Sequence, residues 1–159
     1  MFKRMLKNEK GFTLIELLAV IVILGIIAAI AIPAIGNVID NSRRDSHIAN
    51  ARMMVDATRM YLVNNPNASS PVTLETLVDE GYINNPSAPG FDDGYDPENT
   101  KVFFEQDTPT GNVKEYQIVL IGKTGSGSSA TSIEVIGKAT DPQPIDTVTR
   151  EDVKLPGDK

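Results

Sequence analysis

The feature that most constrains this chain is a run of 20 consecutive uncharged residues from Leu17 to Gly36, mostly Leu, Ile, Val and Ala. About 20 helical residues cross the hydrocarbon core of a bilayer, so the run predicts a membrane-spanning helix. Ahead of it, residues 1–10 carry a net charge of +3. Basic flanks stay on the cytoplasmic side, which predicts that the remainder of the chain crosses the membrane.

A secretory signal peptide and a plain single-pass anchor are two other interpretations of this run. Ala29-Ile30-Ala31 offers the small-x-small pattern of a signal-peptidase site, which would leave a chain beginning at Ile32. The run is longer than the about 7–15 apolar residues of a signal peptide. Neither interpretation explains the carboxylate at Glu16, because a charge in hydrocarbon costs several kcal/mol unless it is neutralised. We therefore expect Glu16 to have a cationic partner.

The residues around this acid form a specific pattern. A short basic leader ends in Gly11, Phe12-Thr13-Leu14-Ile15-Glu16 follows, and the apolar run comes next. The pattern resembles the class III signal of type IV prepilins and pseudopilins. The resemblance implies that a membrane peptidase cuts between Gly11 and Phe12 and methylates the new amino terminus of Phe12. It also implies that Glu16 is the acid used in filament assembly.

An assembly role gives Glu16 a physical purpose. The amine created on Phe12 of one subunit would lie against Glu16 of a neighbour displaced along the filament. In low dielectric such a pair is far stronger than in water, so subunits would be drawn into an axial stagger within the membrane. The helix dipole favours an acid in the first turns of a helix and offsets part of its cost before assembly.

Gly25 and Pro33 are expected to weaken the apolar helix. Gly lowers helix stability by about 1 kcal/mol relative to Ala, and an internal Pro removes a backbone hydrogen bond, so we expect a kink. Both residues are frequent in membrane helices, which is the simpler interpretation of their presence. The family resemblance implies in addition that the stretch between them unwinds in assembled filaments.

Beyond Gly36 the pattern becomes amphipathic, and no Pro follows until Pro66, so we expect one helix from about Thr13 to Asn64. A first apolar set recurs at helical spacing: Ile48, Ala51, Val55 and Leu62. A second set lies beside it: Met54, Ala57 and Tyr61. The pattern leaves open which arc is covered by a head and which meets other subunits.

The remainder of the chain predicts a small head. Thr73 to Gly81 reads as a short helix capped by Thr73 and ended by Gly81. Its phrase TLETLVDEGYI is similar to the segment after the long helix in Gram-positive competence pilins and some pseudopilins. Segments rich in β-branched and aromatic residues predict antiparallel strands at Val102–Phe104, Tyr116–Ile121 and Ser132–Ile136. The expected fold class is α+β, a long N-terminal helix packed against a small antiparallel sheet.

These elements divide the chain into five expected parts. They are a cleaved leader over 1–11, a transmembrane and filament-core helix over 12–36, its amphipathic half over 37–65, an α+β head over 66–140, and a loosely ordered acidic, Pro-containing tail over 141–159.

Residue types exclude several kinds of site. The chain has no Cys, so it has no disulfide, no thiolate metal site and no cysteine nucleophile. His47 is the only histidine, which excludes multi-His metal sites, and its polar neighbours predict a solvated side chain. We find no combination of nucleophile, base and orienting group, and expect neither enzymatic activity nor a catalytic residue.

Two charged clusters give weaker signals. Four carboxylates fall between Asp92 and Glu98, and oxygen-rich loops suit calcium, although the spacing is not that of an EF-hand. A solvated turn is the alternative for the Asp92–Asp96 loop, and some pseudopilins resembling this chain use calcium in a head loop. The basic cluster is Arg43, Arg44, Arg52 and Arg59. It suits either DNA or, better, the acidic heads of neighbouring subunits, because the chain beyond residue 10 sums to −9.

The sequence thus resembles a type IV pilin-like structural subunit, most similar to Gram-positive competence-type major pilins. The resemblance implies a single-pass protein of the cytoplasmic membrane that becomes a helical homopolymer in a cell-surface filament. Its implied partners are the prepilin peptidase, the pilus or secretion machinery, membrane lipid before assembly, and DNA if the filament serves competence. A secretion pseudopilin and a motility or adhesion pilin are alternatives, and a membrane-anchored acidic binding module is an alternative of another class.

Overall fold

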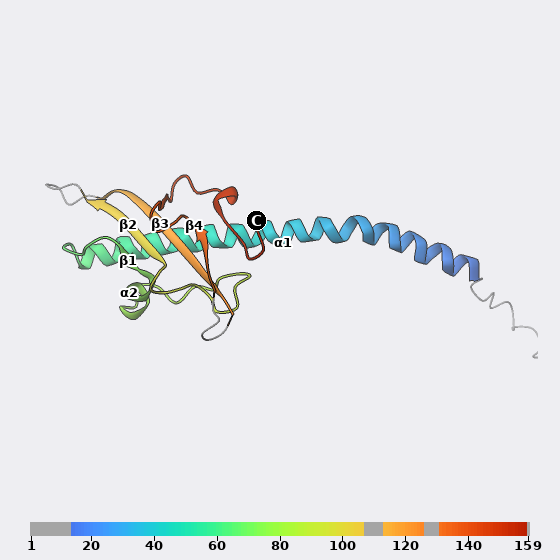
Figure 1. The fold of residues 1–159 in the computed structure, drawn as a ribbon, viewed down its shortest axis with the longest axis horizontal. Coiled ribbons are helices and arrows are strands. Elements are labelled where there is room, and N and C mark those ends of the chain that lie inside the picture. The colour runs from blue at the N-terminus through green and yellow to red at the C-terminus, as the bar shows by residue number, and fades with distance from the viewer. Residues whose placement is uncertain (1–13, 107–112, 126–130, 159) are drawn as a thin grey trace, which may run out of the picture. The chain divides into compact units, whose positions relative to one another are not determined.

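The computed structural model describes residues 14–106, 113–125 and 131–158. The chain divides into two units, Met1–Ile39 and Asp40–Lys159. One helix, α1, spans Leu14–Asn64 and belongs to both, which confirms the expected long helix (Figure 1). Its described part stays helical through Gly25 and Pro33, while the expected kink and unwinding there stay predictions.

In the second unit, α1 packs against a five-stranded antiparallel sheet, and the α+β fold class is confirmed. The strands are β1 (Val72–Thr73), β2 (Lys101–Gln106), β3 (Val113–Thr124), β4 (Thr131–Ile136) and β5 (Gln143–Pro144). Their order is β1-β2-β3-β4, and β5 pairs with β3. The three segments expected as strands are the middle of β2, the middle of β3 and most of β4.

The core lies between this sheet and the second half of α1. Both apolar sets of the helix contribute to it: Ile48, Ala51, Met54, Val55, Ala57 and Leu62 are buried, and Tyr61 is half-buried. Facing residues of the sheet, such as Val102, Ile118 and Ile136, are fully buried. The head therefore covers both arcs that the sequence pattern left undecided.

The short helix α2 spans Leu74–Asp79 and forms for the expected reasons. The hydroxyl of Thr73 accepts a hydrogen bond from the amide of Thr76 at 3.2 Å, which caps the first turn. Gly81, two residues after the helix, has a φ of +77°, a left-handed conformation that glycine adopts readily. Leu74 and Leu77 are fully buried, so the helix is held against the core by its apolar face.

The C-terminal segment differs from the loose tail expected over 141–159. Residues 141–158 include β5 and the 3-10 helix η2 (Arg150–Asp152), and they return to the core. Four of their apolar side chains are buried: Ile145, Val148, Val153 and Leu155. These four lie at irregular spacing among polar residues, so composition concealed a segment whose burial stabilises the head.

Candidate assembly site

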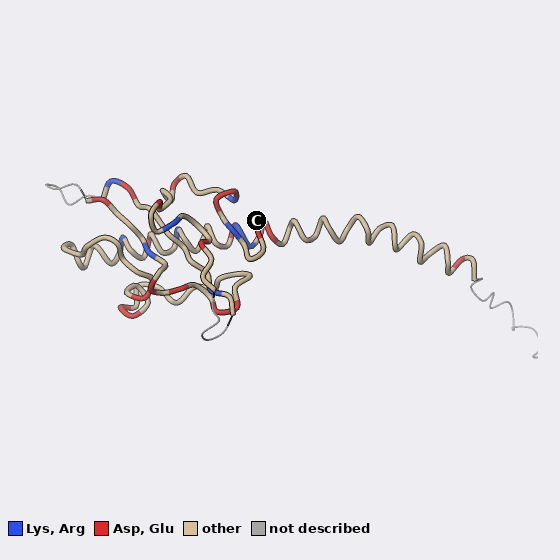
Figure 2. Tube along the Cα trace, viewed as in Figure 1, with Lys and Arg blue, Asp and Glu red and all other residues tan. Residues whose placement is uncertain are grey.

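The first part of α1 presents apolar side chains with little cover from its own chain. Large side chains from Leu14 to Ile39 are each at least 44% exposed. Figure 2 shows no charged residue along this stretch between Glu16 and Asp40. By length and composition, α1 is the one helix among the described residues that can cross a membrane. Such a surface requires lipid or other protein around it.

Glu16 lies in the first turn of α1, where the positive end of the helix dipole favours a carboxylate. The predicted processing residues Gly11 and Phe12 lie outside the described residues. Cleavage between them, methylation of Phe12 and the pairing of its amine with Glu16 therefore stay predictions.

Gly25 has open surroundings within the subunit. Nothing of the chain lies within 4 Å of a Cβ placed on it, and the same holds for Gly36. Packing inside the subunit therefore does not require a glycine at either position.

The outer face of the second half of α1 also carries exposed apolar groups. Met53, Met60 and Val63 are 48%, 62% and 81% exposed. The spacing of these residues places them along one side of the helix. Exposed charged side chains flank them: Arg52, Asp56 and Arg59. We call these six residues the outer stripe.

Three arginines of the predicted basic cluster, Arg43, Arg44 and Arg59, pair with acids of their own chain. Arg43 lies 3.5 Å from Asp40. Arg59 lies 2.9 Å from Asp56, and its guanidinium sits 4.8 Å from the ring centroid of Tyr116. Arg52 lines a hollow of about 280 Å³ with Asp56, Ile145 and Asp146. Acids of the same chain thus already pair with part of the basic cluster. Pairing of these arginines with the acidic heads of neighbouring subunits stays a prediction.

Arg44 fixes the C-terminal segment to α1. Its guanidinium donates hydrogen bonds to the carbonyl of Val153 and, at 2.5 Å, to the carboxylate of Asp158. The amide of Leu155 and the Arg44 guanidinium together hold the pKa of Asp158 below its usual value. The next residue, Asp45, accepts two hydrogen bonds of 2.6 Å from Arg150, which lowers the pKa of Asp45. We call these contacts the C-terminal clamp.

His47 is buried, not solvated as its polar neighbours suggested. Its Nδ1 lies 2.6 Å from the hydroxyl of Tyr95, and its Nε2 lies 3.0 Å from the carbonyl of Pro89. Burial lowers the pKa of His47, and the charge of Arg44 acts in the same direction. The helical spacing could have predicted this burial. His47 precedes the buried residues Ala51 and Met54 by four and seven positions, which places it on the same face of the helix.

The acidic loop does not gather its carboxylates. Asp92 and Asp93 are exposed, whereas Asp96 is buried. Asp96 accepts hydrogen bonds from the amides of Glu98 and Asn99 at 3.2 Å and lies 3.3 Å from Nζ of Lys123. Although burial raises it, the pKa of Asp96 is held below its usual value by hydrogen bonds from Asn99 and Lys123. In the described part of the chain no group of three or more metal-ligating side chains is placed to hold an ion, and calcium binding here stays a prediction.

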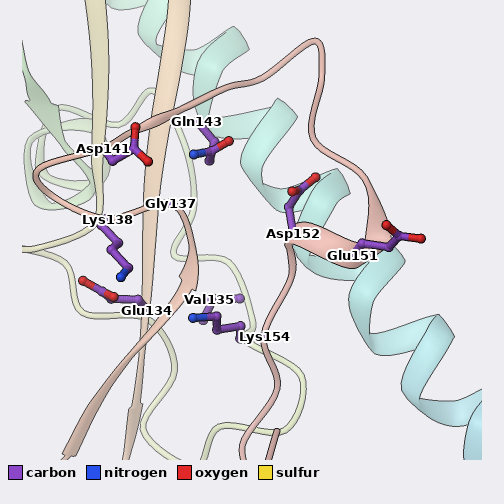
Figure 3. A pocket seen from close by; sticks show the side chains of 9 residues that line it. All are labelled: Glu134, Val135, Gly137, Lys138, Asp141, Gln143, Glu151, Asp152 and Lys154. Carbon is purple, nitrogen blue, oxygen red and sulfur yellow. The ribbon is translucent and has the colours of Figure 1, made fainter. Parts of the chain in front are cut away.

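A pocket of about 260 Å³ lies beside β4 and η2 (Figure 3). Its lining includes the carboxylates Glu134, Asp141, Glu151 and Asp152. Lys138 and Lys154 line the same pocket, so positive charge offsets much of the negative charge. This mixed lining gives no selective attraction for either a cation or an anion.

Comparisons with known proteins agree with the architecture. Residues 6–32 match the model of the prokaryotic N-terminal methylation motif. The chain is 29% identical over 119 residues to the type II secretion system core protein G of Klebsiella michiganensis, which covers 75% of this chain and 79% of the relative. It is 50% identical over 52 residues to the type IV major alpha-pilin of Moraxella bovis, which covers 31% of this chain and 33% of the pilin.

No solved structure matches the chain significantly. Three observations agree with one another. The methylation motif covers the start of the apolar helix, the fold joins a long helix to a small antiparallel sheet, and the two relatives are named as a secretion core protein and a pilin. The N-terminal motif and the two relatives make the chain similar to type IV pilins and to a type II secretion core protein.

Proposed function

We propose that this structural subunit is cut between Gly11 and Phe12, held in the membrane by the first part of α1, and then polymerised with these helices at the centre of a filament. The observation that carries the proposal is the largely apolar surface of Leu14–Ile39, exposed along its length and with Glu16 as its only charged residue. A bilayer covers that surface before assembly, and neighbouring helices replace the lipid afterwards.

The outer stripe supports the same proposal. Met53, Met60 and Val63 extend the exposed apolar surface of α1 beyond the membrane-spanning stretch. Neighbouring subunits that stack their helices would cover both regions together. The charged residues of the outer stripe would fix the axial offset between neighbouring subunits, because an offset that brings like charges together is unfavourable.

Among filament classes, a secretion-type pseudopilus is the better supported. Similarity to the secretion core protein extends over 75% of this chain, whereas similarity to the pilin covers 31%. A match that long includes much of the head, which distinguishes classes better than the shared helix does. Neither relative is named for an enzymatic activity, which accords with a structural role.

Competence, motility and adhesion stay predictions of the family resemblance. DNA contact would need the basic cluster, yet Arg43, Arg44 and Arg59 contact acids of their own chain. The acidic balance of the head also opposes a polyphosphate. A deletion strain assayed in parallel for exoprotein release and for DNA uptake would separate the secretion role from the competence role.

The first test of processing is the intact mass and N-terminal sequence of the protein in sheared filaments and in membranes. We expect a chain that begins at methylated Phe12 in the filaments. A chain that begins at Ile32, or an uncut chain found only in membranes, would contradict the proposal and favour an anchored or secreted binding module.

The test of assembly is Glu16→Ala, with Glu98→Ala, an exposed acid of the head, as the matched control. We expect normal cleavage of both variants. Losing one partner of a charge pair in low dielectric costs about 3–5 kcal/mol, so Glu16→Ala should lower filament yield more than tenfold. Wild-type filament yield from Glu16→Ala would refute the pairing of Glu16 with the amine of Phe12.

A further inference from the structure

His47 lies at the contact between α1 and the connection that joins α2 to β2. It is fully buried and stands between two aromatic rings of that connection. The ring centroids of Phe91 and Tyr95 lie 5.7 and 5.6 Å from that of His47, both edge-on. Around His47 the connection meets α1 through residues 87–91, which we call the contact segment, and through the hydroxyl of Tyr95, while Tyr82 contacts α1 farther along at Tyr61 and Asn64.

Two backbone carbonyls determine where every proton of this contact lies. The carbonyl of Pro89 only accepts, so Nε2 of His47 carries the proton and donates across 3.0 Å. The carbonyl of Ser87 also only accepts, so the amide nitrogen of Asn50 faces it at 2.7 Å. The same nitrogen donates its second proton to the Tyr95 oxygen at 3.0 Å.

The hydroxyl proton of Tyr95 is left with one direction. Its oxygen accepts from Asn50, and its proton points at the lone pair on Nδ1 of His47, 2.6 Å away. Among the described residues every buried side-chain nitrogen or oxygen has a hydrogen-bond partner, and the contacts above satisfy those of this network. It is complete only with a neutral imidazole in the Nε2–H form.

Protonation of His47 would turn one of these four hydrogen bonds, the one between Nδ1 and the Tyr95 hydroxyl, into a repulsive contact. A proton on Nδ1 would face the hydroxyl proton of Tyr95 across 2.6 Å, and Asn50 prevents the tyrosine from turning to accept. The ring would become a buried cation without an acceptor at Nδ1, and a buried charge is stable only when paired. The arrangement relaxes when the contact segment moves away and water reaches the ring.

The surrounding charges favour the same outcome. Arg44, about one turn earlier on α1, places a positive charge near the ring and opposes a second one. Arg43 lies on the same side, where its Cδ is 3.9 Å from a Cβ placed on Gly90. The nearest acid in sequence to Tyr95, Asp96, pairs with Lys123. Within the described residues no carboxylate pairs with the imidazole to stabilise its charged form.

Residues 94 and 96 of the connection are attached to β3 by backbone hydrogen bonds. The amide of Asp96 donates to the carbonyl of Ile121 at 2.8 Å, and the amide of Lys123 donates to the carbonyl of Gly94 at 2.9 Å. Phe91 covers Gly122, where an added Cβ would lie 2.4 Å from the phenylalanine ring. The two backbone hydrogen bonds do not involve His47, so they survive its protonation, whereas Phe91 touches both His47 and Gly122 and marks the end of the part that is released.

We propose that His47 is an acid-sensitive switch: protonation of its ring releases residues 87–91 from α1, while residues 93–96 stay paired with β3. The switch is independent of the filament class, and it changes the surface of the head beside the C-terminal clamp. Asn50 is the positioning residue, because it holds Tyr95 as a donor to the ring.

The test uses the full-length chain in detergent micelles, with its single histidine labelled for magnetic resonance. At about pH 7.5 we expect the neutral Nε2–H tautomer. Between about pH 6.5 and pH 5, exchange of the Phe91 amide, corrected for intrinsic pH dependence, should accelerate about tenfold or more. The Asp96 amide, held by β3, should not accelerate. An Nδ1–H tautomer, an unchanged Phe91 amide, or equal acceleration of both amides would overturn the proposal.

Two variants separate the switch from general acid sensitivity. His47→Gln keeps a buried donor and acceptor but cannot titrate, so its Phe91 amide should lose the acid response. Asn50→Ala lets Tyr95 turn and accept from the charged ring, so the titration of His47 should move to higher pH and the acceleration should shrink. Asn64→Ala is the matched control. Asn64 also donates to a tyrosine hydroxyl, that of Tyr82, at a distance of 3.0 Å, but this hydrogen bond does not involve His47. An Asn50→Ala protein that responds to acid like Asn64→Ala would overturn the role of Asn50.

Discussion

Single side chains hold the C-terminal segment on α1. Asp45 meets Arg150 through two hydrogen bonds of 2.6 Å, and Arg44 meets the carbonyl of Val153 and the carboxylate of Asp158. The chain has no cysteine, so this end of the head is closed without a disulfide. The clamp offers a structural answer to how such a head is closed.

The clamp predicts an acid-labile contribution from Asp45. The Arg150 guanidinium lowers the pKa of Asp45, so its stabilising effect is complete above about pH 5 and is lost as pH falls through the folded-state pKa. Asp45→Asn should lower the thermal midpoint at neutral pH, and the difference from wild type should disappear near about pH 2. Thermal unfolding of the full-length chain at several pH values measures this.

The exposed acid Asp146 provides the control for this pair, through Asp146→Asn. Arg150→Gln should have the same effect as Asp45→Asn, and the double variant should be no worse than either single change. Fully additive losses would mean that the two side chains act separately.

At the scale of elements, α1 serves two surfaces with one helix. Met54 is fully buried against the sheet, whereas Met53, its neighbour in sequence, is 48% exposed on the outer stripe. A helix places adjacent residues about 100° apart, so neighbouring methionines reach opposite environments.

These two methionines give a matched test of the packing. Met54→Ala should lower the free energy of unfolding by about 2–5 kcal/mol, because it leaves a cavity in the core. Met53→Ala should change it by about 0.5 kcal/mol or less. Denaturant unfolding followed by circular dichroism distinguishes them, and similar losses from both variants would contradict the buried placement of Met54. Met53→Ala should instead reduce filament yield if the outer stripe meets other subunits.

Local patterns predicted the regular elements well. The Thr73 cap and Gly81 located α2, and β-branched runs located β2, β3 and β4, since each signal depends on neighbours in sequence. The same patterns missed His47 and the clamp, because their partners lie between 42 and 114 residues away. The polar composition over 141–159 predicts a loose tail, because the four apolar residues that are buried there do not recur at a helix or strand spacing. Contacts at such separations are fixed by the fold and not by local sequence.

On the scale of the whole molecule, the C-terminal segment is part of the head's core. It contributes four buried side chains and β5, and the amide of Lys154 donates to the carbonyl of Val135 at 2.9 Å. A chain ending at Asp141 should therefore fail to form a protease-resistant head, because it exposes the apolar surface that these residues cover.

A chain ending at Leu155 is the control, since it keeps all four buried residues and loses only part of the clamp. It should remain folded with a lower thermal midpoint. A protease-resistant head in the chain ending at Asp141 would contradict a role for the C-terminal segment in the core.

The clamp also determines which chemical conditions the head tolerates. Closure by ion pairs needs no oxidant and no thiol exchange. Reducing agents, which open heads closed by disulfides, should leave this one intact. Concentrated salt should loosen it instead, because mobile ions screen charges on exposed side chains.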